Sequence, residues 1–70
     1  MRNDIYLKGM GSRIRAARQA KKMTLQQLGG LMNVNISNLS FLERGRRNPH
    51  LLTLKSIADI LGVDVIDFLS

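Results

Sequence analysis

Apolar residues recur at three- and four-residue spacing along most of this chain, in short segments separated by turn-forming residues. That period is typical of amphipathic helices, whereas the alternating pattern of a half-buried strand is missing. The clearest stripe belongs to residues 51–61 and ends before Gly62; its members are Leu51, Leu54, Ile57, Ala58 and Leu61. The pattern therefore predicts an all-α fold of five short helices without an internal repeat.

Polar residues mark where these helices are expected to begin. Ser12 is predicted to cap a helix that runs to about Lys22. Thr24 and Gln27 have the spacing of a capping box, which would open a second helix over residues 25–32. By the same reasoning Asn35 caps a helix that Gly45 ends, and Asp64 caps a last turn over residues 65–69.

Seventy residues hold a single core. Residues 1–10 mix polar and apolar side chains and end in Gly9-Met10-Gly11, so we expect a flexible or loosely docked arm. Residues 11–70 would then form the folded domain.

The segment from Leu25 to Arg44 has a specific arrangement. Its two helices are joined by about three residues, too few for antiparallel packing, so they should cross at the steep angle of a helix-turn-helix. Leu28, Met32, Leu39 and Leu42 would close that angle, Val34 would plug the turn, and Gly29 would give clearance at the crossing. Periodicity alone would suit a generic helical bundle as well.

The distribution of charge along the chain indicates what kind of partner it binds. The chain has 11 basic against 5 acidic residues, a net +6. From Lys8 to Arg47 the chain has nine basic residues and a single acidic residue, Glu43, whereas residues 53–70 carry a net charge of −2. Such a distribution favours a polyanionic partner, most commonly nucleic acid, although a solvated basic surface is the alternative.

Other functional classes find little support. The chain has no cysteine, no evident metal-ligand constellation, no glycine-rich phosphate loop and only one histidine, His50, so we expect no enzyme, metal or cofactor. No apolar run approaches the length that crosses a membrane. We expect a cytoplasmic protein.

Arginines gather at the end of the helix that Asn35 is predicted to cap. Arg44, Arg46 and Arg47 lie at or beyond its end, where guanidinium groups suit phosphate binding, with Asn48 and Thr24 as additional contacts. On an ideal helix, Ser37, Ser40, Phe41 and Arg44 share one face, with Ile36 at its edge. Rather than contact nucleic acid, Ile36 and Phe41 could cover the core or contact a protein partner.

The stretch from about residue 10 to residue 69 resembles the phage Cro/repressor type of helix-turn-helix domain, also called lambda-repressor-like. The resemblance rests on Arg18, on Leu39 with LERG at 42–45, on RRNP at 46–49 and on the ending IADILGVDVIDFL. It implies a five-helix domain that binds operator DNA as a dimer and usually regulates transcription.

The resemblance also implies roles for single residues. Arg18 and Glu43 stand where the family has an ion pair between its first and third helices, and a structural role for the lone acid is favoured over a catalytic one. The family reads bases from the positions of Ile36, Ser37, Ser40 and Phe41. Three positions depart from the family pattern, where Leu25 replaces glutamine, Lys22 replaces glycine and Gly29 replaces alanine.

We therefore expect a sequence-specific regulator, in the simplest case a repressor, that binds double-stranded DNA at a palindromic operator as a homodimer. The final helix, with Val65, Ile66, Phe68 and Leu69, is the expected dimer surface, unless it only closes the core. The alternative is a protein-interaction module on the same fold, such as an antitoxin or an accessory regulatory subunit. Exposure of Leu25, Ile36 and Phe41 would favour that alternative.

Overall fold

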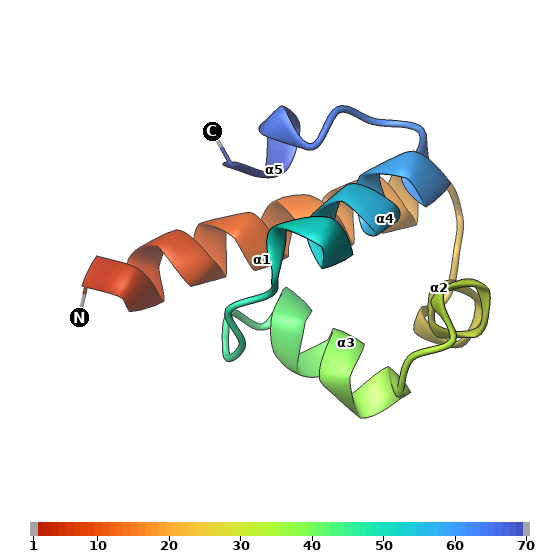
Figure 1. Cartoon of the computed structure of the whole chain (residues 1–70), viewed down its shortest axis with the longest axis horizontal. Helices are drawn as coiled ribbons and strands as arrows, with labels where there is room; N and C mark the ends of the chain where they lie inside the picture. The colour runs from red at the N-terminus through yellow and green to blue at the C-terminus, as the bar shows by residue number, and fades with distance from the viewer. Residues whose placement is uncertain (1, 70) are drawn as a thin grey trace.

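Helices account for all of the regular structure in residues 2–69, which are the residues that the computed structural model describes. They are α1 (Arg2–Ala20), α2 (Leu25–Met32), α3 (Ile36–Glu43), α4 (Leu51–Leu61) and α5 (Ile66–Leu69), arranged as Figure 1 shows. The predicted all-α, five-helix fold is confirmed. Within this described part of the chain, none of the helices combines the length and hydropathy that crossing a bilayer requires.

The first helix begins ten residues earlier than Ser12, so the prediction that Ser12 caps it is wrong. Residues 2–10, expected as a loosely docked arm, are the first half of α1; residues 1 and 70 lie outside the described range. The reason is tertiary packing, since Met10 is buried and Leu7 packs against the core. Those contacts outweigh the low helix propensity of Gly9 and Gly11.

Gly11 is required by the approach of α3 to α1. A Cβ atom at Gly11 would lie 2.5 Å from the carbonyl oxygens of both Leu42 and Glu43. Any larger residue would push the end of α3 away from α1.

At its other end α1 stops at Ala20, two residues before the predicted Lys22. Lys22 adopts a left-handed φ of 55°, and the Met23 amide donates to the carbonyl of Arg18 over 3.1 Å. This is the position where Lys22 replaces the glycine of the related family, and a side chain makes the conformation costly.

The predicted capping residues of α2, α3 and α5 are confirmed, although α5 begins at Ile66, one residue later than predicted. Thr24 accepts from the Gln27 amide, and the Gln27 side chain accepts from the Thr24 amide, which completes the capping box of α2. Asn35 caps α3 and Asp64 caps α5 through their side-chain oxygens. Gly45 and Gly62 follow their helices with positive φ, as expected of C-terminal residues.

The helix-turn-helix crossing is also observed. In Figure 1 α2 is seen nearly end-on while α3 lies across the view, so the two helices cross steeply. Leu28, Leu39 and Leu42 are buried at this junction, and Gly29 is buried against them. The Val34 amide donates to the carbonyl of Gly29, and Val34 is 38% exposed and is not part of the core, so the expectation that Val34 plugs the turn is wrong.

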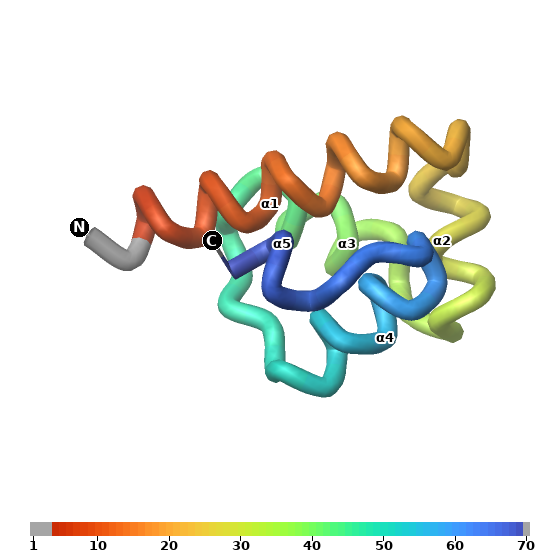
Figure 2. The backbone as a smooth tube through the Cα atoms, turned by 90° about the horizontal axis from the view of Figure 1, so that it is seen from above, coloured from red at the N-terminus to blue at the C-terminus, as the bar shows by residue number. Residues whose placement is uncertain are grey.

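The core lies between α1 and the other four helices. Viewed from above, α1 runs the length of the molecule with α5 beside it (Figure 2). Ile14 of α1, Ile57 of α4 and Phe68 of α5 are all fully buried or nearly so. The fold thus packs one side of α3 against the core and leaves the opposite side exposed to solvent.

Candidate nucleic-acid interface

The inner side of α3 is fixed in the core. Leu39 and Leu42 are buried, as the helical spacing predicted, and Glu43 is buried with them at the last turn. An isolated eight-residue helix is unstable in water, so these contacts are what keep α3 helical and in place.

Glu43 forms a two-pronged ion pair with Arg18 of α1. The Arg18 Nε donates to Oε2 over 2.7 Å and Nη2 donates to Oε1 over 2.9 Å, while Nη1 donates to the carbonyl of Met23 over 2.7 Å. The hydrogen bond to Glu43 raises the pKa of Arg18 more than burial lowers it, with a further contribution from the opposite charge. The pair therefore ties α1, α3 and the turn before α2 together.

A second glycine brings the end of α3 against α1. Gly45 has a φ of 76°, and a Cβ there would lie 2.6 Å from the Cα of Lys8. The Gly45 amide donates to Leu42 and the Arg46 amide donates to Phe41, over 3.1 and 2.8 Å. This bonding pattern is a Schellman motif, and it sets the direction in which the chain leaves α3.

The outer face of α3, defined by Ile36, Ser37, Ser40 and Phe41, is open to solvent to different degrees. Ile36 and Ser37, in the first turn, are exposed. Ser40 and Phe41, one turn later, are half-buried. The structure thus brings the four predicted base-reading residues to one face, with its first turn the most accessible.

The arginine cluster, defined as Arg44, Arg46 and Arg47, lies beside this face. All three side chains are exposed, as is Asn48. Within the described part of the chain, no carboxylate forms an ion pair with any of the three arginines. Their positive charge is therefore directed at solvent.

The structure adds a contact that the sequence reasoning missed. The guanidinium carbons of Arg44 and Arg47 lie 5.1 and 5.4 Å from the centroid of the Phe41 ring. The three-residue spacing of Phe41 and Arg44 was a signal for the first contact. Arg47 lies beyond the Schellman turn, so helical spacing could not have indicated the second.

Thr24 is exposed at the start of α2, and its hydroxyl caps the helix as expected. A threonine hydroxyl that accepts one bond keeps its own proton for donation. Leu25, which replaces the family's glutamine beside it, is partly buried against the core.

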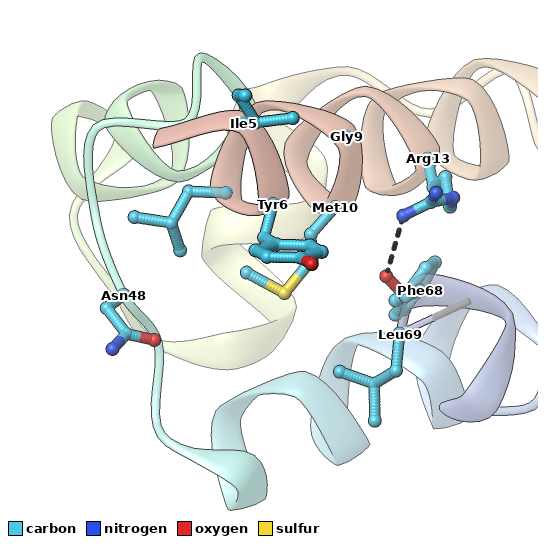
Figure 3. A pocket seen from close by; sticks show the side chains of 9 residues that line it. Ile5, Tyr6, Gly9, Met10, Arg13, Asn48, Phe68 and Leu69 are labelled. Atoms are coloured by element: carbon cyan, nitrogen blue, oxygen red, sulfur yellow. Dashed lines mark hydrogen bonds between the residues drawn. The ribbon is translucent and has the colours of Figure 1, made fainter. Parts of the chain in front are cut away.

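An apolar hollow of about 710 Å³ opens between the first half of α1, α5 and Asn48 (Figure 3). Ile5 and Tyr6 are over 70% exposed there, and Leu69 is 55% exposed. Arg13 donates to the carbonyl of Phe68 over 3.2 Å, which fixes α5 on α1. In the expected dimer surface, Phe68 closes the core and Val65 packs against it, while Ile66 and Leu69 face outward.

Comparisons with known proteins agree with this geometry. A helix-turn-helix family model matches residues 14–68. The HTH-type transcriptional regulator DdrOP3 of Deinococcus deserti is 42% identical over 81% of this chain and 44% of its own length. The immunity repressor protein of Bacillus phage phi105 is 43% identical over 80% of this chain and 39% of its own length, so the chain spans less than half of these curated relatives.

Among solved structures, the restriction-modification controller protein C.AhdI from Aeromonas hydrophila superimposes with a TM-score of 0.83. It is 29% identical, and the match covers 89% of this chain and 94% of that one. The family match and the five-helix architecture lead to one assignment: the chain belongs to the Cro/repressor-type helix-turn-helix family of transcriptional regulators.

Proposed function

We propose that this chain is a sequence-specific regulator that binds double-stranded DNA, with α3 in the major groove. The observation that supports this proposal most directly is that α3 has two different sides. Its buried side is held by Arg18 and Glu43, and its outer face is flanked by exposed arginines. A helix fixed in this way presents its side chains to base edges without paying to order itself on binding. The repressor named among the relatives supports repression as the mode of action.

Base reading falls mainly to the first turn of α3. Ser37 can hydrogen-bond to several base edges, and Ile36 offers an apolar contact for a thymine methyl group. Ser40 is half-buried, so it would contribute a shorter reach into the groove.

Phosphate binding falls to the arginine cluster, with Asn48 and Thr24 at its margins. Guanidinium groups bind phosphate with paired donors, and these contacts fix register without reading sequence. The absence of a paired carboxylate at the three arginines, within the described residues, leaves them available for DNA.

A homodimer on a palindromic operator completes the proposal. The exposed Ile66 and Leu69 of α5, with Ile5 and Tyr6 beside the hollow, supply an apolar surface for a two-fold contact. Such a dimer would place two copies of α3 about 34 Å apart on one side of the duplex. A regulator of this kind works on the bacterial nucleoid, in the cytoplasm.

The test is selection from a pool of random duplexes, followed by fluorescence anisotropy with the enriched and a scrambled duplex. The proposal expects two half-sites related by two-fold symmetry, about 10 base pairs apart, and at least about 1000-fold tighter binding to the enriched duplex. Random recovery of sequences would contradict sequence-specific binding. A single half-site would retain DNA reading and remove the dimer.

The interaction-module alternative now has less support at the outer face. Of the three residues whose exposure would favour it, Leu25 and Phe41 are only partly exposed, and Ile36 alone is open to solvent. A hydrophobic protein partner would also leave the arginine cluster without a role.

A further inference from the structure

The Phe41 ring has two positively charged side chains close to it. Two guanidinium groups, those of Arg44 and Arg47, lie within 6 Å of its ring centroid, the range in which a cation is attracted to an aromatic face. The ring is half-buried, so part of its remaining surface is already taken by protein.

The third arginine of the cluster is tied to the same residue through the backbone. The Arg46 amide donates to the carbonyl of Phe41 over 2.8 Å, the long bond of the Schellman motif. Gly45, which makes this turn possible, has a positive φ and leaves no room for a Cβ atom against the backbone of Lys8. The Phe41 ring therefore contacts the guanidinium groups of Arg44 and Arg47, whereas the Phe41 carbonyl fixes only the backbone of Arg46.

We propose that Phe41 is a positioning residue that orders two members of the arginine cluster, Arg44 and Arg47, for phosphate binding, and that it does not read bases. This inference rests on the proposed DNA-binding function and assigns a different role to one residue of the outer face. The N–H donors of a guanidinium lie in its plane, so contact of its face with a ring does not use them. The Arg44 Nε donates to the carbonyl of Ser40 over 3.4 Å, which leaves the Nη donors of Arg44 for phosphate.

The physical gain is entropic. A free arginine side chain has many rotamers, and binding a phosphate would have to freeze them. Because the ring already restricts Arg44 and Arg47 in the free protein, less freedom is lost when DNA arrives. Since phosphate contacts carry no sequence information, the effect must be equal for every duplex.

The first arm of the test uses the free protein. Phe41→Leu keeps an apolar side chain and removes the ring, while Phe41→Tyr keeps the ring. NMR should give ring-current-shifted Nε–H signals for Arg44 and Arg47 in wild type and Phe41→Tyr, and lose those shifts in Phe41→Leu. The Arg46 side chain, which makes no ring contact, is the internal control. Identical arginine shifts with and without the ring would overturn the proposal.

The second arm measures affinity for the selected and a scrambled duplex. Phe41→Leu should weaken both by the same factor, about 3- to 10-fold, because the Arg44 and Arg47 side chains would then lose more rotamer freedom on binding. Phe41→Tyr should stay within about 2-fold of wild type, because its ring offers the same face. A change in the ratio between the two duplexes would assign base reading to Phe41 and overturn the positioning role.

The third arm separates positioning from a general effect on folding. If Phe41 acts through Arg44 and Arg47, adding Phe41→Leu to the double variant Arg44→Ala, Arg47→Ala should cause no further loss. In an Arg46→Ala background the full loss should remain. Additive losses in both backgrounds would overturn the proposal. If wild type binds no duplex, the DNA-binding function itself fails, which the wild-type titration reports separately from every variant.

Discussion

The two sides of α3 differ in what holds them and in what a mutation there should change. Its inner side contacts α1 through a buried ion pair and the backbone approach at Gly11, so the groups there have fixed protein partners. Its outer side carries exposed Ser37 and exposed arginines, which contact only the Phe41 ring or nearby backbone and are not held by a carboxylate within the described residues. We therefore expect inner residues to govern the stability of the fold and outer residues to govern DNA binding.

The largest effect is expected from breaking the inner side with Glu43→Gln. This change leaves the charge of Arg18 buried and without its carboxylate, which should lower the free energy of unfolding by about 3 kcal/mol. Urea denaturation followed by circular dichroism measures it. Asp59→Asn, which removes the exposed pair with Lys55, is the matched control and should cost less than about 0.5 kcal/mol. Equal losses for the two variants would contradict the difference between buried and exposed pairs.

On the outer side, Arg46→Ala combined with Arg47→Ala should weaken binding to every duplex alike, by about 10- to 100-fold. Losing two phosphate contacts should also reduce the slope of log affinity against log salt by about 2. Anisotropy titrations at several salt concentrations give both quantities, and the melting temperature should stay close to that of wild type. A loss confined to the selected sequence would mean that these arginines read bases.

Ser37→Ala tests the reading turn. It should change the ratio of affinities for operator variants by about 5-fold, because a lost hydrogen bond to a base edge is worth about 1 kcal/mol. Competition footprinting on paired operators measures this ratio. An equal loss on all duplexes would move Ser37 from base reading to phosphate contact.

The smallest effect should come from Lys22→Gly, which lies on neither side of α3. Lys22 has a φ of 55°, so glycine should raise the free energy of unfolding by about 0.5–1 kcal/mol without changing DNA affinity. Thermal melting with and without DNA checks both parts. Destabilisation would indicate that the lysine side chain makes up for the strained backbone.

Local signals made much of this architecture predictable. Thr24 with Gln27, Asn35 and Asp64 cap their helices because a side-chain oxygen two or three residues away satisfies an amide wherever the chain turns helical. The inward spacing of Leu39 and Leu42 likewise follows from helix geometry alone.

The misjudged features depend on contacts between distant segments. Gly11 looked like a break in the sequence, yet it lies inside α1 because Met10 and Leu7 pack on the core, and the residue is glycine because α3 carbonyls approach it closely. Val34 looked like a turn plug, but its backbone bond to Gly29 leaves its side chain exposed. The stacking of Arg47 on Phe41 depends on how the chain leaves α3 after Gly45, which residue spacing does not encode.

The proposed function depends on the outer side of α3 and its arginines forming a surface for duplex DNA. The most direct measurement is wild-type affinity for the selected duplex from 50 to 200 mM salt, a range of about fourfold over which counterion release is linear on logarithmic axes. With three arginines on phosphate, the slope should be about −2.7 per bound copy. A slope near zero, or no binding at the lowest salt, would contradict binding of DNA phosphates by the arginine cluster.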